Sequence, residues 1–176
     1  MNAGTYKEKG IRGLRIYGKG TLDGSGAKWW KEFWDYRGRT DKPKGYYNYP
    51  KLLSICNCEG VSIEGLRLVD SSFWNLHLLY CRDVVVRNVS IIAPDGAPSS
   101  DGIDVDSSCD VLIEGCYISV DDDCISMKSG RDVLGLMAAR PTENVTIRNC
   151  RFGYGHGCVD CGSEVSGWIR NVHAYN

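Results

Sequence analysis

Acidic residues concentrate between Ala97 and Gly130, among residues typical of β-strands. They are Asp101, Asp104, Asp106, Asp110, Asp121, Asp122 and Asp123. The last three directly precede an alternating apolar and polar segment, which predicts that they lie at the start of a strand. Crowded carboxylates raise the pKa of at least one of them, and a protonated acid beside an ionised one suits acid–base catalysis near neutral pH. A solvated acidic turn or a cation site would show the same triplet.

The whole chain has the composition of one globular unit, so we expect a single domain over residues 1–176. It is 43% hydrophobic and carries a formal charge of −1. Lys and Arg are scattered without a basic run, and no apolar segment reaches 18 residues, so neither nucleic acid nor a membrane is expected as a partner. No signal peptide is visible at the first residues. Either the protein stays inside the cell or the chain lacks its true beginning.

The nine cysteines are an odd number, so they cannot all pair within one chain. Most occupy apolar positions of strand-like segments, which favours buried thiols that pack like small apolar side chains. Cys158 and Cys161 have the spacing of a redox or metal-binding pair, but no second pair completes a zinc site. We therefore expect all nine to be structural.

An internal repeat reveals the elements that must position the aspartates. Each copy is a strand, a Gly or Asn corner and a second strand. The copies are residues 61–68, 84–91, 111–118, 145–152 and, in part, 168–172. Their central residues are 23, 27, 34 and 22 positions apart. Period-two alternation, corners that tolerate a left-handed backbone and a repeat in the twenties predict an all-β solenoid of parallel strands.

The repeat predicts several further features of the structure. Ile63, Val86, Ile113 and Ile147 should form one interior column. Residues 14–21 resemble a further coil, and no helical period competes with the strand pattern. The stretch from Trp29 to Tyr49, which is rich in aromatic and charged residues, is expected to be a long excursion from the stack.

Equal repeat offsets predict where the acidic residues meet. Asp122 and His156 each lie nine residues after the central residue of their copy, so they should stack on adjacent coils about 4.8 Å apart. Asp101 joins the same column if the preceding loop supplies six extra residues. Asp123 can face the same cleft as Asp122 only if the chain bends there, because successive side chains of a strand point to opposite faces.

Three ordered motifs in this arrangement resemble those of glycoside hydrolase family 28, the polygalacturonases and their relatives. They read APSSDGID (97–104), DDCISMKSG (122–130) and GHG (155–157), the last followed by GSE (162–164). Supporting matches are residues 18–24 with 29–30, 73–74 with His77 and Cys81, and 140–144. The GSE segment and residues 128–131 look most like the bacterial exo-acting branch.

The resemblance implies a right-handed parallel β-helix of the pectin lyase-like type, here the central coils of a larger catalytic domain that is incomplete at both ends. It implies inverting hydrolysis of α-1,4-galacturonosyl linkages, with pectic polysaccharide or oligogalacturonide as the substrate. No metal and no cofactor are implied. It also suggests a secreted or periplasmic enzyme, and a cytoplasmic one stays open because no signal peptide is seen.

The resemblance further assigns roles to four residues. Asp122 resembles the general acid that protonates the glycosidic oxygen, and Asp101 and Asp123 resemble the pair that holds and deprotonates the attacking water. His156 resembles the residue that tunes the acid by hydrogen bonding. The crowding of the carboxylates agrees, because it keeps one proton in place at mildly acidic pH.

Four more residues are candidates for substrate binding: Lys128, Arg131, Trp74 and His77. The two cations suit uronate carboxylates, but either would also serve as a solvated surface charge. Trp74 and His77 would border the sugar subsites, or else pack beside a strand.

Two departures from the family pattern bear on function. Ser99 stands where the family usually has Asn, which affects a substrate contact and hence the polymer recognised. The family's Arg-x-Lys motif does not occur before Asn176, as expected for part of a larger enzyme. Two rival classes therefore stay open, a Ca²⁺-dependent pectate lyase, which is also a parallel β-helix with carboxylate ligands, and a non-catalytic polysaccharide-binding β-helix. The GHG motif argues against the lyase.

Overall fold

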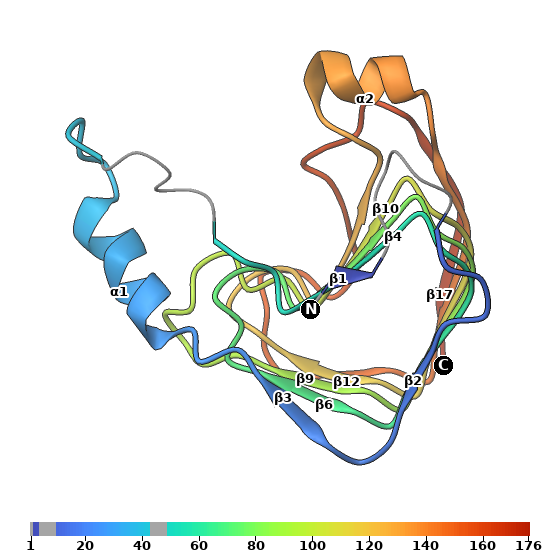
Figure 1. Ribbon diagram of the computed structural model, residues 1–176, viewed down its shortest axis with the longest axis horizontal. Helices are drawn as coiled ribbons and strands as arrows, with labels where there is room; N and C mark the ends of the chain where they lie inside the picture. The colour runs from blue at the N-terminus through green and yellow to red at the C-terminus, as the bar shows by residue number, and fades with distance from the viewer. Residues whose placement is uncertain (1, 4–9, 43–48) are drawn as a thin grey trace.

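A computed structural model describes residues 2–3, 10–42 and 49–176 of the chain. In these residues the chain winds into a parallel β-helix with three sheets around a closed interior (Figure 1). Sheet A contains β1 (Asn2–Ala3), β4 (Leu53–Cys56), β7 (Leu76–Leu79), β10 (Ile103–Asp106), β13 (Ile125–Lys128) and β16 (Asp160–Cys161). Sheet B contains β2 (Arg15–Tyr17), β5 (Glu59–Glu64), β8 (Arg82–Arg87), β11 (Cys109–Glu114), β14 (Thr142–Arg148) and β17 (Ile169–Tyr175). Sheet C contains β3 (Thr21–Asp23), β6 (Arg67–Val69), β9 (Ser90–Ile92), β12 (Tyr117–Ser119) and β15 (Arg151–Phe152).

The predicted interior column is confirmed in sheet B. Ile63, Val86, Ile113 and Ile147 lie level on four successive strands, and none is more than 2% exposed. Ile16 extends the column at β2, which confirms the predicted coil at residues 14–21. Burial of branched apolar side chains from every coil is what holds a solenoid of this kind together.

The corner residues of the repeat adopt the backbone that their types predict. Gly65, Asn88, Gly115 and Asn149 have φ angles of 76°, 52°, 64° and 54°. Glycine and asparagine are the residues that enter this left-handed region most readily. The chain can therefore turn from sheet B into sheet C at the same place in each coil.

The alignment of the partial fifth copy is wrong. Ile169 lies level with Thr142, and it is Ala174 that continues the column at Ile147. The motif also matched five residues too early because the strands of sheet B contain a second left-handed position near their start. Asn144 in β14 and Asn171 in β17 both occupy it, with φ near 55°. The two amides stack, with Asn171 Nδ2 donating to Asn144 Oδ1 at 3.1 Å.

In the residues that the structure describes, two short helices interrupt a chain that the sequence predicts to be strand and loop. Helix α1 (Ala27–Tyr36) falls largely in the predicted excursion, and Figure 1 shows it outside the stack. The indoles of Trp30 and Trp34 tie it to the coils by donating to the carbonyls of Ser71 and Gly96. Part of that excursion, residues 43–48, lies outside the described residues.

Helix α2 (Asp132–Ala138) leaves the stack after β13. The strand pattern hid it because only one of its residues, Gly135, is buried, so no helical period marks it. No helix in the described ranges is long and apolar enough to cross a membrane.

All nine cysteines are free thiols, and seven are buried as predicted. Cys158 and Cys161 are exposed. Cys161 nevertheless belongs to β16, where it lies level with Met127.

The middle strands of sheet A, β7, β10 and β13, are buried on both faces, which distinguishes this sheet from the other two. Its inner face carries apolar side chains, and its outer face carries polar and charged ones. The inner residues Ile55, Leu78, Val105 and Met127 are 0% exposed. The outer residues His77, Asp104, Asp106 and Lys128 are 0–9% exposed. Buried ionisable groups on one face of a sheet indicate where the chemistry of the molecule lies.

Candidate active site

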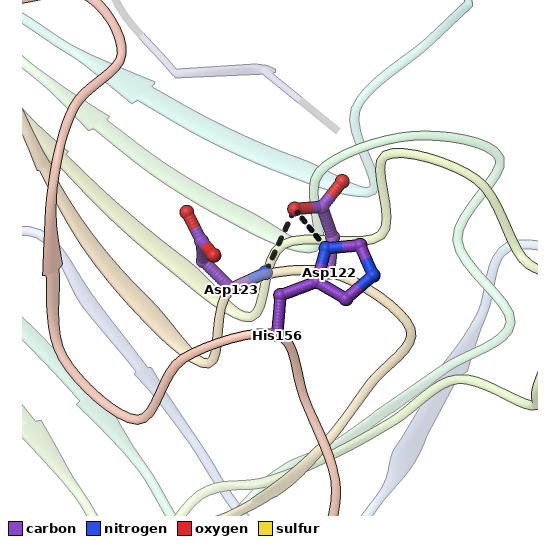
Figure 2. A group of neighbouring side chains, drawn as sticks. All are labelled: Asp122, Asp123 and His156. Carbon is purple, nitrogen blue, oxygen red and sulfur yellow. Dashed lines mark hydrogen bonds and ion pairs between the residues drawn. The ribbon is translucent and has the colours of Figure 1, made fainter.

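Asp122 and His156 stack on adjacent coils, as their equal repeat offsets predict. The backbone N–H of His156 donates to the carbonyl of Asp122 at 2.9 Å. The side chains also meet, with Nδ1 of His156 3.4 Å from Oδ1 of Asp122 (Figure 2). His156 is 64% exposed, so this contact lies at the open surface of the outer face.

The chain bends where Asp122 and Asp123 must share a cleft. Residues 121 and 122 form a bend before β13 begins. The backbone N–H of Asp123 donates to the same Oδ1 atom of Asp122 at 3.0 Å (Figure 2). One ligand atom from each of Asp122, Asp123 and His156 lies within 4.8 Å of the other two. This meets the geometric requirement that both carboxylates face one site.

Asp101 is displaced by one position from the predicted column. Strands β10 and β13 pair Ile103 with Ile125, so Asp101 continues that register at the level of Asp123 instead of Asp122. The loop before Asp101 is one residue shorter than the alignment required, and loop length is not fixed by the repeat. Asp101 still belongs to the same edge, because the charge of Asp122 acts on its carboxyl.

The neighbouring coils hold Asp101 by its backbone. Asn75 donates its backbone N–H to the carbonyl of Asp101 at 2.8 Å, and its side-chain amide donates to the same oxygen at 3.1 Å. On the other side, Gly102 donates to the carbonyl of Asp123 at 2.9 Å. Ser99, the departure from the family pattern, adopts a φ of 52°, where asparagine is the better suited residue.

Glycines on both sides of His156 let its coil approach the aspartates. A Cβ at Gly155 would lie 2.6 Å from Sγ of Cys124, and one at Gly157 would lie 1.8 Å from Oδ2 of Asp160. Real Cβ contacts are longer than 3.0 Å, so the Asp160 carboxylate would have to move for a side chain at Gly157, whereas at Gly155 the backbone carbonyl of Asp122 is also only 3.0 Å away. The GHG motif is therefore a packing requirement as well as a means of presenting a histidine.

Lys128 lies beneath this edge and is surrounded by carboxylates. Its ammonium nitrogen is 3.5 Å from Asp101, 3.5 Å from Asp104 and 3.2 Å from Glu164. It also donates to the carbonyl of Gly162 at 2.9 Å. Burial alone would lower the pKa of Lys128, but the three carboxylates raise it to about 12. Lys128 is therefore a permanent cation at this site.

Three carboxyl groups at this edge of sheet A, those of Asp101, Asp104 and Asp123, bind protons more tightly than usual. Burial, and next the charge of Asp122, raise the pKa of Asp101 from 3.8 to about 6. Burial, and next the charge of Asp101, raise the pKa of Asp104 well above its usual value. Burial, followed by the charges of Asp160 and Asp122, also raises the pKa of Asp123. Neighbouring carboxyl groups of different acidity are what acid–base catalysis needs.

Trp74 and His77 adjoin the cluster from the preceding coil. The centroid of the Trp74 ring lies 4.9 Å from the Lys128 nitrogen. The rings of Trp74 and His77 meet edge to face, with their centroids 5.0 Å apart. His77 is 4% exposed, and burial lowers its pKa, so its ring is neutral at pH 7. Its Nε2 atom is 3.3 Å from Oδ2 of Asp106. His77 therefore supports the floor beneath Trp74, and Trp74 is the more accessible of the two.

Arg131 lies apart from these groups. Its side chain is 77% exposed and pairs with Asp132 at the start of α2. Both residues line a shallow cavity of about 290 Å³ together with Glu164, so Arg131 borders the site on the side of the next coil.

Sequence reasoning quoted Asp104 and Glu164 within motifs but assigned them no role, and it missed Asp160 entirely. Asp160 lies level with Ser126 and Asp104 on the outer face of sheet A. Applying the same repeat offsets to the residues after His156 would have placed Asp160 on this face. Glu164 gave no such signal, because it follows the end of β16.

A separate cavity lies elsewhere in the described residues. It measures about 450 Å³ and is lined by residues around Tyr80, Arg82 and Arg140 at the far ends of the sheet A strands. None of the four proposed catalytic residues lines it. We place the site at the aspartate edge because the proton-binding groups converge there. Asp122, Asp123 and His156 are close enough to share an ion, but exposed carboxylates commonly gather without one, so this donor set does not identify a metal.

Comparison with known proteins fixes the family. The family model described as glycosyl hydrolases family 28 matches residues 5–175. The chain belongs to this family. Among curated relatives, it is 36% identical to a probable polygalacturonase of Vitis vinifera over 157 residues, which are 88% of this chain and 30% of the relative. It is 30% identical to an exopolygalacturonase of Zea mays over 159 residues, which are 86% of this chain and 35% of the relative.

Solved structures of polygalacturonases share the fold. The exopolygalacturonase of Thermotoga maritima superposes with a TM-score of 0.82 at 31% identity, covering 94% of this chain and 44% of that one. The polygalacturonase of Erwinia carotovora gives a TM-score of 0.74 at 24% identity, covering 94% and 43%, and supports the fold alone. The chain thus spans about a third of its curated relatives. Plant and bacterial proteins both match, so the comparisons establish the family and not the branch.

Proposed function

We propose that the full-length protein hydrolyses α-1,4-galacturonosyl linkages of polygalacturonate with inversion of configuration. The observation that carries this proposal is the convergence of Asp101, Asp122, Asp123 and His156 from three successive coils on one open edge of sheet A. Membership of family 28 supports the substrate class, because the relatives described above are polygalacturonases by name.

Each residue has one task in this reaction. Asp122 gives its proton to the glycosidic oxygen as the bond to the anomeric carbon breaks. A water held by Asp101 and Asp123 attacks that carbon from the opposite face and gives its proton to one of these carboxylates. His156, 3.4 Å from Asp122, holds the acid in its orientation.

Inversion is the most specific part of the proposal. The spacing of Asp122 and Asp123, taken alone, is closer to that of retaining enzymes. Acid and base in inverting enzymes are typically about 6.5–9.5 Å apart, whereas retaining pairs are about 5–5.5 Å apart. The closest Asp122 and Asp123 atoms fall within 4.8 Å, nearer to a retaining pair. We favour inversion because Asp101 adds a third carboxylate on the water side, where retention would need only one nucleophile.

We also propose that the protein belongs to the bacterial exo-acting branch. The residues that support this are Gly162-Ser163-Glu164 and Lys128 to Arg131, together with the 31% identity to the exopolygalacturonase of Thermotoga maritima. An exo enzyme releases short products from chain ends from the start. If the viscosity of polygalacturonate instead collapses before short products accumulate, the enzyme is endo-acting.

The reaction class is tested by incubating the full-length protein with polygalacturonate and excess chelator. New reducing ends without unsaturated product are expected. Ultraviolet absorbance from unsaturated ends that disappears with chelator would instead identify a Ca²⁺-dependent lyase. Binding of the polymer without any product would leave a non-catalytic binding protein.

A further inference from the structure

Lys128 has the position of an internal partner and not of a surface cation. Its side chain is 5% exposed, and the ring of Trp74 lies 4.9 Å from its nitrogen on the outer side. Its contacts are made within the chain, to three carboxylates and to the carbonyl of Gly162. A substrate carboxylate would have to displace one of these partners and move Trp74 to reach it.

The contacts of Lys128 connect three parts of the fold. Lys128 itself ends β13, Asp101 and Asp104 belong to the preceding coil, and Glu164 follows β16 in the next one. In the described part of the chain, Lys128 is the only cation within 4.0 Å of the Asp101 carboxylate. Its position is itself fixed, because it shares the Gly162 carbonyl with the hydroxyl of Ser126.

We propose that Lys128 is a positioning residue that holds the Asp101 carboxylate in place and in its ionised form by sharing its ammonium group with Asp104 and Glu164. The effect of Lys128 on the ionisation of Asp101 depends on this chain alone. Its consequence for catalysis rests on the role proposed above for Asp101. Lys128 thus has a different task from the substrate contact, or the solvated surface charge, that its residue type suggests in the sequence.

The charges that face Asp101 determine what Lys128 can do. Burial and the charge of Asp122 raise the pKa of Asp101, and Lys128 lowers it. Asp104, three residues further along in β10, lies 3.5 Å from the same ammonium group. A water-activating base must be ionised, so Lys128 extends the range of pH in which Asp101 can act. Removing Lys128 should leave Asp101 protonated to a higher pH.

The direct test follows the Asp101 carboxyl carbon by NMR titration in full-length protein labelled with ¹³C-aspartate, with Asp101→Asn used for assignment. Lys128→Met should move the midpoint to higher pH. The matched control is Arg82→Met, which removes an exposed cation from a 2.8 Å ion pair with Asp110 and should leave the midpoint unchanged. An unmoved midpoint in Lys128→Met would overturn the proposal. Because no substrate is involved, this result stands whether or not the protein is a hydrolase.

Kinetics then separate positioning from substrate binding. Loss of alignment by about 1 Å costs on the order of 10²-fold in rate. Lys128→Met should therefore lose about that factor in kcat with little change in KM, and the acid limb of its pH–rate profile should shift to higher pH. A large rise in KM with kcat and the acid limb unchanged would show that Lys128 binds substrate instead.

Glu164→Gln provides an opposite test that also holds if Lys128→Met does not fold. This change keeps the shape of the side chain, which is 21% exposed, and removes one carboxylate that competes for Lys128. The midpoint of Asp101 should move to lower pH, opposite to the change in Lys128→Met. A shift to higher pH, or none, would contradict the shared-cation arrangement.

Discussion

The two faces of sheet A are built on the same strands from opposite kinds of residue. On β10, Val105 points inward and is 0% exposed, while Asp104 points outward and is also 0% exposed. On β13 the same contrast separates Met127 from Lys128. Burying apolar surface stabilises the stack by roughly 25 cal/mol per Å², whereas burying a charge costs free energy unless it is paired.

This contrast shows that the inner face of sheet A contributes stability and its outer face carries the groups for chemistry. The inner face can be explained by packing alone, because its side chains form continuous apolar columns. The outer face keeps carboxyl groups and a lysine out of water, which shifts their pKa values and makes them useful as acids and bases. Substitutions on the two faces should therefore have different signatures.

The largest effect is expected for Asp122→Asn. Removing a general acid typically costs 10²- to 10⁴-fold in rate. Turnover of polygalacturonate should fall by about that factor, while the folded structure is retained because the amide nearly matches the carboxylate in shape. Steady-state kinetics and circular dichroism on the purified variant check both parts. Near wild-type turnover would mean that another residue is the acid.

On the inner face, Met127→Ala should destabilise the fold without a specific effect on chemistry. Truncating a fully buried side chain of this size costs about 2–5 kcal/mol in the free energy of unfolding. Urea unfolding of the variant measures this loss. As a control, Val133→Ala on α2, where the side chain is 66% exposed, should change it by no more than about 0.5 kcal/mol. Equal losses at the two positions would contradict the assignment of the core.

Asp101→Asn should stabilise the fold, and by an amount that depends on pH. The folded-state pKa of Asp101 is raised from 3.8 to about 6, so its contribution to stability is full below about pH 4 and is lost as the pH rises through 6. The amide has no such loss. It should gain up to about 3 kcal/mol over the wild type at pH 7 and little at pH 4. Urea unfolding at both pH values tests this, and an equal gain at both would show that ionisation is not the cause.

The smallest effect is expected for Asp121→Asn, next to the proposed acid. The Asp121 carboxylate accepts the backbone N–H of Gly96 at 3.0 Å, which an amide oxygen can also do. We expect kcat to change by less than about twofold, since this contact lies outside the groups assigned to proton transfer. Kinetics parallel to those of Asp122→Asn give the comparison. A comparable loss of kcat in both variants would mean that Asp121 and Asp122 contribute equally to catalysis, and that the acid is not assigned to the right residue.

The repeat in the sequence was enough to predict the coil and much of the site. Ile113 and Ile147 fix the register of sheet B, and that register carries Asp122 to His156 without further information. The same logic failed at Asp101 and at the fifth copy. At Asp101 it failed because the repeat does not fix the length of the preceding loop. At the fifth copy it failed because two similar left-handed positions in each coil match the same short motif.

Other features could not be predicted because they arise from contacts between coils. Glu164 follows the end of β16, so no strand register places it, and its approach to Lys128 depends on the path of the loop. The burial of Lys128 likewise depends on Trp74 from two coils earlier. Helix α2 lacks an apolar stripe directed at the core, which is the pattern that identifies most surface helices.

The anomeric configuration of the first product tests the central claim, that Asp122 acts as an acid opposite a water held by Asp101 and Asp123. It is read by ¹H NMR during the first minutes of polygalacturonate hydrolysis by the full-length protein, before mutarotation. The account predicts that the β-anomer appears first and the α-anomer only later. An α-anomer that appears first would show retention, with Asp123 as a nucleophile close to Asp122, and would contradict the proposed mechanism.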